Sequence, residues 1–149
     1  MTLDYSTPGM FKLLMPKFIK ETISDFEKIM PKAKGNKSTA APKNLFEVDD
    51  KCPDLDKRKK EAFHRLVAKV LFATKRARPD TATTISFLMT RTQKPDKDDW
   101  AKLEHLMRYI RATKDMPLKL GAVGDGKLRW WIDGSHAVHP NMRGHTGGG

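Results

Sequence analysis

Apolar residues recur at helical spacing between about residues 57 and 76, and this pattern constrains the fold more than any other feature of the chain. One face of the predicted helix consists of Ala62, Phe63, Leu66, Val67, Val70, Leu71 and Thr74. A helix with one apolar face has to bury that face against another element. The chain around it must therefore supply packing partners.

Two more helices are predicted to follow, each delimited by proline. Arg78-Pro79-Asp80 ends the first helix and opens the second, because proline breaks the hydrogen-bond ladder and an acid is favourable in a first turn. The second helix has a face of Ile85, Leu88 and Met89 and ends at Lys94-Pro95. Asp96 can cap the third, whose stripe consists of Trp100, Leu103, Leu106, Met107 and Ile110. Residues 57–116 are thus predicted to form a small three-helix bundle.

The chain before this bundle is predicted to contain a hairpin, a helix and a linker. Apolar and polar positions alternate over the first fifteen residues around the turn Thr7-Pro8-Gly9, which is typical of a hairpin. Pro16 suits the start of an amphipathic helix that reaches residue 30. Residues 31–56 are rich in Pro, Lys, Ser and Thr. A connection this long is unusual inside a compact domain, so a linker between two subdomains is expected.

After Pro117 the apolar spacing changes to two residues. Apolar positions bracket the turn Gly124-Asp125-Gly126 and predict a second hairpin; they are Leu118, Leu120, Leu128, Trp130 and Ile132. The predicted fold class is therefore α+β, with a hairpin and helix over residues 1–30, a linker over 31–56, the bundle over 57–116 and the C-terminal hairpin within 117–149.

Positive charge is the strongest compositional signal. The chain has 29 Lys and Arg against 18 Asp and Glu, a net charge of +11, which favours a polyanionic partner. Residues 57–78 contain a single acid, Glu61, among nine cations: Lys57, Arg58, Lys59, Lys60, Arg65, Lys69, Lys75, Arg76 and Arg78. On a helix whose other face is apolar, several of these must project together and could follow a phosphate backbone. A basic face that is merely solvated is the competing interpretation.

Two groups of residues could hold metal ions. Val48-Asp49-Asp50 resembles the paired aspartates with which polymerases hold two Mg²⁺ ions, but it lies in a Pro- and Lys-rich segment with no returning strand, so an exposed acidic loop is favoured. His136, His139 and His145 have a spacing that could bind zinc, but a strand and loop surround them, so incidental surface histidines are favoured. Cys52 is the only cysteine and is interpreted as a loop residue.

The sequence also predicts where the chain works. No apolar run approaches the roughly 20 residues that a membrane span requires, and no apolar stretch of a secretory signal opens the chain. An intracellular protein is expected, in a cytoplasmic particle or the nucleus, neither secreted nor bound to a membrane.

Several sequence blocks, taken in order, resemble a copia-type LTR-retrotransposon polyprotein, from the end of the reverse transcriptase into the start of its RNase H domain. They are MTLDYSTPG at 1–9, FHRLVAKVLF at 63–72, Arg78-Pro79-Asp80, Asp99-Trp100, Arg108-Tyr109 with Thr113, and WWIDGSHAVH at 130–139. The resemblance implies that residues 1–30 end the polymerase palm, that 57–116 form a thumb or connection, and that 117–149 begin RNase H.

The same resemblance implies a function and its partners. The region would grip the template–primer, an RNA–DNA or DNA duplex, together with the rest of the polyprotein. Asp133 would be the first carboxylate of the RNase H site, which uses Mg²⁺ in the parent enzyme. The paired polymerase aspartates and the other RNase H acids are expected to lie outside this chain, so a fragment without complete active sites is expected. A stand-alone basic helical nucleic-acid-binding protein and a histidine-dependent metal protein are the alternatives.

Because two divalent ions need several carboxylates and the resemblance assigns only Asp133, we expect the chain alone to have no polymerase or nuclease activity. No cofactor is predicted for it alone. A Mg²⁺-dependent polymerase assay and an RNase H assay on the purified chain measure this. Turnover above that of the Asp133→Asn variant would contradict the prediction.

Overall fold

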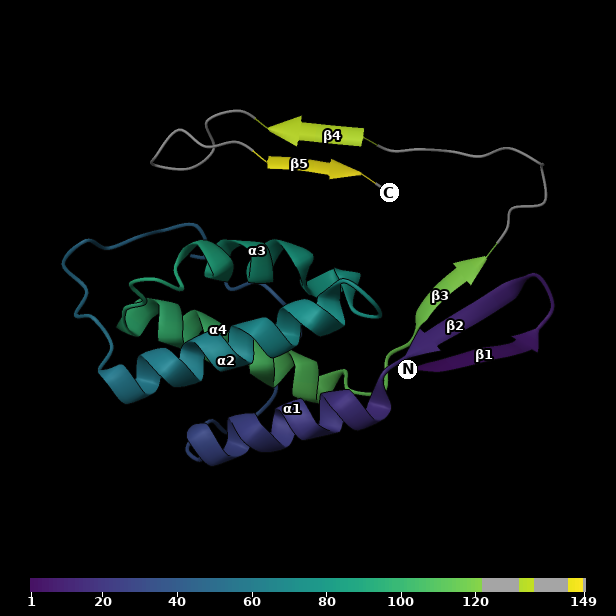
Figure 1. Cartoon of the computed structure of the whole chain (residues 1–149), viewed down its shortest axis with the longest axis horizontal. Helices are drawn as coiled ribbons and strands as arrows, with labels where there is room; N and C mark the ends of the chain where they lie inside the picture. The colour runs from purple at the N-terminus through teal and green to yellow at the C-terminus, as the bar shows by residue number, and fades with distance from the viewer. Residues whose placement is uncertain (122–131, 136–144, 149) are drawn as a thin grey trace.

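The computed structural model describes residues 1–121 and the backbone of residues 132–135 and 145–148. This described part is α+β, as predicted, with four α-helices, a three-stranded antiparallel sheet and a two-stranded hairpin (Figure 1). The elements in chain order are β1 (Thr2–Thr7), β2 (Met10–Leu14), α1 (Pro16–Ile29), α2 (Lys57–Thr74), the 3₁₀ turn η1 (Pro79–Thr81), α3 (Ala82–Thr90), α4 (Lys97–Ala112), β3 (Leu118–Gly121), β4 (Ile132–Ser135) and β5 (His145–Gly148).

Helices α1 and α2 begin where the sequence predicts. Pro16 occupies the first turn of α1, where its missing N–H costs no hydrogen bond. Asp56 caps α2, because its side chain accepts a 2.9 Å hydrogen bond from the Lys59 backbone N–H. Such a cap satisfies one of the N–H groups that a helix start leaves unpaired.

Helix α4 has a fuller N-terminal cap. Asp96 and Asp99 form a reciprocal capping box, in which each side chain accepts a hydrogen bond from the other residue's backbone N–H. Arg91, just after α3, donates to both carboxylates at 3.0 Å. Burial, and the charge of Asp96, raise the pKa of Asp99 above its usual value even though hydrogen bonds to its charged form oppose this. The cap thus also fixes the short α3–α4 connection.

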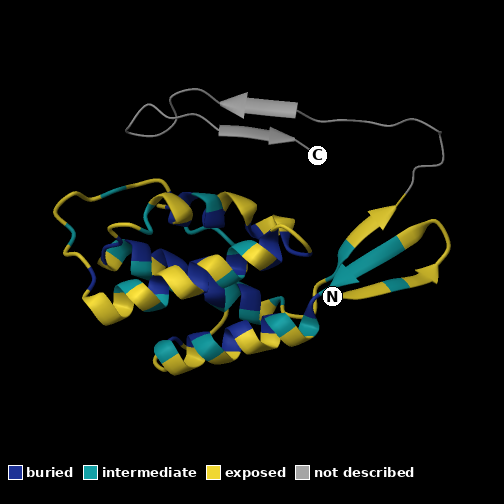
Figure 2. Cartoon of the chain, in the orientation of Figure 1, coloured by how far each residue is buried: buried dark blue, intermediate teal, exposed yellow. Residues whose placement is uncertain are grey.

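One hydrophobic core joins all four helices. Phe26 of α1, Phe63 of α2, Leu88 of α3 and Leu103 of α4 each have no exposed surface, and they belong to a single cluster. Helix α1 packs on α2 and α4 (Figure 1), and the buried stripes of the helices face one another (Figure 2). The predicted three-helix bundle therefore has α1 as a fourth member.

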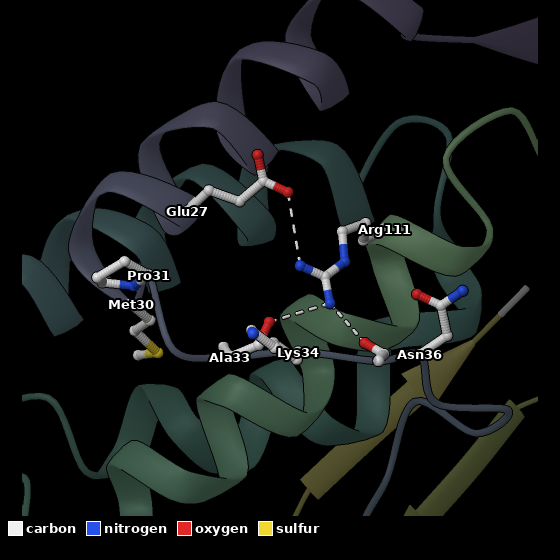
Figure 3. Close-up of a pocket in the computed structure, with 8 residues that line it drawn as sticks. Glu27, Met30, Pro31, Ala33, Lys34, Asn36 and Arg111 are labelled. Carbon is white, nitrogen blue, oxygen red and sulfur yellow. Dashed lines mark hydrogen bonds and ion pairs between the residues drawn. The ribbon is translucent and has the colours of Figure 1, made fainter.

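Residues 31–56 are not the predicted linker between two subdomains. They run along α4 and are held there chiefly through their own carbonyl groups. Arg111 of α4 donates to the Ala33 carbonyl at 3.1 Å and also to that of Gly35, while it approaches Glu27 of α1 at 3.5 Å (Figure 3). Leu45 and Leu55 are buried in the shared core. The segment therefore belongs to the helical domain.

The sheet joins residues that are far apart in the chain. Strands β1 and β2 form the predicted N-terminal hairpin, and Gly9 in its turn has a φ of 74°, a conformation that favours glycine. Strand β3 pairs with β2, so that Leu13 lies opposite Leu118 and Phe11 opposite Leu120. The turn of the predicted second hairpin and its residues up to Trp131 lie outside the described residues, whereas Ile132, the last apolar position of its second strand, pairs with Gly148 of β5. Asp133 falls inside β4, paired with Gly147 of β5.

Helix α3 exposes one residue that the periodicity placed inside. Met89 is 41% exposed, whereas Phe87 is 4% exposed and takes the inward position. The buried residues of α3 are Thr84, Ile85, Phe87 and Leu88, and at 100° per residue they occupy a sector that leaves Met89 beyond its edge. Phe87 then meets the ring of Phe46 edge-on, with centroids 5.7 Å apart.

In the part of the chain that the structure describes, no helix is both long and apolar enough to cross a bilayer.

We predict that Phe26→Ala lowers the free energy of unfolding by about 3–5 kcal/mol, the usual cost of truncating a buried Phe. Because α1 shares its core with α2–α4, the loss should appear in one cooperative transition that all helices follow. Urea unfolding monitored by circular dichroism measures it, with the exposed Phe46→Ala as a comparison. Two separate transitions would show that α1 folds apart from the other helices.

Candidate nucleic-acid interface

The outer face of α2 carries a row of cations spaced along the helix axis. Arg58, Arg65 and Phe72 follow one another at intervals of seven residues, so each lies about two turns, or roughly 10.5 Å, beyond the last. Arg76 lies in the turn that follows α2, and its guanidinium is beside Phe72. Lys57 and Lys75 lie to one side of it at the two ends of α2. All six side chains are exposed.

Five of these residues are cations without an acidic partner among residues 1–121. The ion pairs there do not involve Lys57, Arg58, Arg65, Lys75 or Arg76. Their charge is therefore available to an external anion. We call these five residues the α2 cation row.

Arg76 is oriented by an aromatic neighbour. Its guanidinium lies 3.6 Å from the centroid of the Phe72 ring and donates to the Phe72 carbonyl at 3.2 Å. Phe72, itself 42% exposed, packs on Phe18 of α1 with ring centroids 5.0 Å apart. Contact with a ring face orders the guanidinium without removing its charge. Arg76 remains able to meet a phosphate.

Three lysines of the predicted basic patch have acidic partners. Lys59 lies 3.6 Å from Asp56, and Lys60 lies 3.6 Å from Asp54. Lys69 forms an ion pair with Asp25 of α1, and that hydrogen bond is the main reason why the pKa of Asp25 is lowered. Exposed pairs of this kind contribute little stability and exchange readily. These lysines are secondary contributors to any anion contact.

Arg78 was predicted to belong to the basic patch, but it is buried and is therefore not part of the candidate interface. Its side chain is 3% exposed, and it donates to both carboxylate oxygens of Asp80, at 2.9 and 2.8 Å. It also donates to the carbonyl and hydroxyl of Thr113 at 3.1 and 2.6 Å, and the Tyr109 hydroxyl donates to Asp80 at 2.9 Å. We call these four residues the Arg78 cluster. It joins the end of α2 to the end of α4.

The other sequence-predicted sites are not brought together into a metal site in the described residues. Asp49 and Asp50 are exposed in a turn, and Asp49 accepts a hydrogen bond from the Lys51 backbone at 2.9 Å. His136 and His139 lie outside the described residues, and only the backbone of His145 and Asp133 is described. Cys52 is a free thiol in the same turn region as Asp49. Within the described part, no group of three or more His, Cys, Asp and Glu side chains could hold a metal ion.

A hollow lies beside Arg111, where this side chain holds residues 33–35 against α4 and is not free to bind an external anion. It has a volume of about 580 Å³ and lies between the C-terminal end of α1 and residues 31–36 (Figure 3). Arg111 and Lys34 are the cations that line it, and the Ala33 and Gly35 carbonyls and Glu27 already accept the N–H groups of Arg111. Its donors are used within the chain.

Comparison with known proteins finds no family model, no curated protein and no solved structure that matches the chain. The copia-type resemblance therefore rests on the sequence blocks that carry it.

We predict that Asp80→Asn destabilises the chain near neutral pH by on the order of 3 kcal/mol, because it leaves a buried guanidinium without its counter-charge. Burial alone would raise the pKa of Asp80, but the hydrogen bonds and charge of Arg78 outweigh it and hold the pKa below its ordinary value. A lowered folded-state pKa gives stability that is complete above the unfolded value, near 4, and is lost as the pH falls through the folded value.

The gap between wild type and Asp80→Asn should therefore narrow below about pH 4. Urea unfolding at pH 7 and at pH 3 measures it, and the exposed Asp115→Asn serves as the matched control. An equal gap at both pH values would show that the charge of Asp80 is not what stabilises Arg78.

Proposed function

We propose that this chain is a nucleic-acid-gripping region of a copia-type reverse transcriptase–RNase H polyprotein, and that it contacts the template–primer through the α2 cation row. The observation that carries the proposal is the exposure of five cations along one side of α2 and in the turn directly after it, none of which has an acidic partner among residues 1–121, while the opposite side of α2 is buried. Cations aligned in this way suit a linear polyanion better than a compact ligand.

The length of the row fits a nucleic-acid backbone. From Lys57 to the C-cap Lys75 the row extends over the length of α2, about 27 Å along the helix axis. One strand of a duplex presents a phosphate about every 3.4 Å along its axis but winds around that axis, so a straight row of this length meets a few phosphates of a strand where the strand faces it. Contacts with phosphates position a protein on nucleic acid without reading its sequence, which is what a grip on a moving template–primer requires.

The Arg78 cluster supports the copia-type assignment. Arg78 and Asp80 belong to one of the sequence blocks behind the resemblance, while Tyr109 and Thr113 belong to another. The four residues meet in one hydrogen-bonded cluster although 29 to 35 positions separate the blocks. The two blocks therefore hold the ends of α2 and α4 together, and this common role accounts for the presence of both in one chain. The palm, thumb and RNase H assignments of residues 1–30, 57–116 and 117–149 remain part of this proposal.

The Mg²⁺ of the parent enzyme does not enter the proposed role. By resemblance Asp133, in β4, would be one ligand of an RNase H site, where metal ions activate water and stabilise the leaving oxygen. One carboxylate does not make a two-metal site. We therefore assign this chain no catalytic step.

A stand-alone nucleic-acid-binding domain is the second candidate. The single core shared by α1–α4 and residues 31–56 favours it, because such a core supports folding without further domains. The reading frame around this chain distinguishes the two, since the copia-type proposal requires the paired polymerase aspartates upstream and further RNase H acids downstream.

We predict that the triple variant Arg58→Gln, Arg65→Gln and Arg76→Gln binds an RNA–DNA duplex more weakly and with less dependence on salt. Each lost phosphate contact should reduce the slope of log K against log salt by roughly 0.9. Fluorescence anisotropy with a labelled duplex between 50 and 200 mM salt measures the slope.

A triple variant that removes three exposed lysines of residues 31–56 is the matched control, because it changes the net charge equally away from α2: Lys34→Gln, Lys43→Gln and Lys51→Gln. If both variants lower the slope to the same extent, binding follows net charge and the α2 cation row has no special role.

A further inference from the structure

A groove runs beside the α2 cation row, between the C-terminal end of α1 and the N-terminal half of α2. Its volume is about 740 Å³, within the range of sites that hold small molecules or their equivalents in a polymer. Four cations line it: Lys28, Arg58, Lys59 and Arg65. Trp100 of α4 lines it as well.

Trp100 gives the groove a flat apolar wall that is fixed in place. The side chain is half-buried and packs against the shared core. It stands in the first turns of α4, whose start is held by the Asp96–Asp99 capping box. A fixed indole in a basic groove offers both a stacking surface and counter-charges.

The acids of the groove leave it positive. Asp56 and Glu61 are the two carboxylates that line it, so four cations exceed them by two. The Asp56 side chain is engaged as the cap of α2, and its hydrogen bond from the Lys59 backbone is the main cause of its lowered pKa. The electrostatic balance favours an anionic occupant.

We propose that this groove binds an unpaired nucleotide of a nucleic-acid strand, with its base against Trp100 and its phosphates at Arg58, Arg65 and Lys28. The proposal rests on the proposed function, because Arg58 and Arg65 belong to both the row and the groove. An acidic peptide would satisfy the cations but would leave the indole without a planar partner. A nucleotide satisfies both features, since every base has a π-face and every linkage a charge.

A comparison of two oligomers tests the site. One is the eight-nucleotide dT₈, and the other is an abasic eight-mer with the same number of phosphates. We expect the wild-type chain to bind dT₈ roughly 5- to 150-fold more tightly, the ratio typical of one base on an aromatic side chain. Trp100→Leu should abolish the difference, Trp100→Phe should keep most of it, and Arg65→Gln should weaken both oligomers alike. Fluorescence anisotropy measures each affinity.

Each alternative has its own result. Equal binding of both oligomers by the wild type would overturn the proposal, because only the backbone would be recognised. A preference that survives Trp100→Leu would place the base elsewhere, for example on the exposed Phe72, and would also overturn it. Displacement of dT₈ by a poly-glutamate of equal charge at the same concentration as by unlabelled dT₈ would favour an acidic protein partner. If neither oligomer nor any duplex binds, the proposed function itself fails.

A second measurement covers the case in which Trp100→Leu does not fold. The indole N–H of Trp100, assigned with Trp100→Phe, should shift in the ¹H–¹⁵N spectrum of the wild-type chain when dT₈ is added and should not shift with the abasic oligomer. Identical shifts with both would overturn the proposal.

Discussion

The guanidinium of Arg78 is almost wholly buried, and the way it is satisfied determines how the helices meet. A buried charge has to be paired and hydrogen-bonded, or it costs several kcal/mol. Asp80, two positions further along the chain, supplies the counter-charge. Thr113, at the end of α4, supplies two further acceptors, its carbonyl and its hydroxyl. Because the chain turns after α2 ends at Thr74 and Pro79 then opens η1, these groups converge. The ends of α2 and α4 are thereby held together, and α3 is fixed across them.

The two long helices of the core use their cations in different ways. Helix α4 turns polar side chains toward the carbonyl groups of residues 31–56: the cations Lys102 and Arg111 donate to Glu47 and Ala33, and the His105 ring contacts the Thr39 carbonyl. This covers one side of α4 with the chain's own backbone. Helix α2 receives no such cover on its outer side, so its cations face solvent. Position in the fold, more than charge itself, makes α2 the candidate interface.

This difference also marks how far the sequence could predict the structure. The helices follow from apolar spacing, Pro16, Pro79 and the Asp96 cap, since these are local features. The docking of residues 31–56 on α4 could not be predicted in this way. Hydrogen bonds from side chains of α4 to backbone carbonyls leave no periodic pattern in the sequence of the segment that accepts them. For the same reason the nine cations of 57–78 read as one patch. Nothing local distinguishes Arg78, which is buried, from Arg76, which stacks on Phe72 at the surface. The apolar spacing of the third predicted helix places Trp100 in the core. Its position at the wall of the groove depends on where α1 packs, and local sequence does not reveal that.

The net charge of +11 consequently overstates what a polyanion would meet. Charges that are paired with acids or bound to carbonyls displace few counterions when nucleic acid approaches, because their field is already largely compensated. The charges that release counterions are those left free, and the cations of the α2 cation row have no acidic partner among residues 1–121 and are aligned as well. If all five contacted phosphates, the salt slope would be about −4 to −5, far below what the total charge suggests. A slope of that size would locate the interaction on one helix face, whereas a value near the full net charge would describe a protein coated by nucleic acid without a defined site.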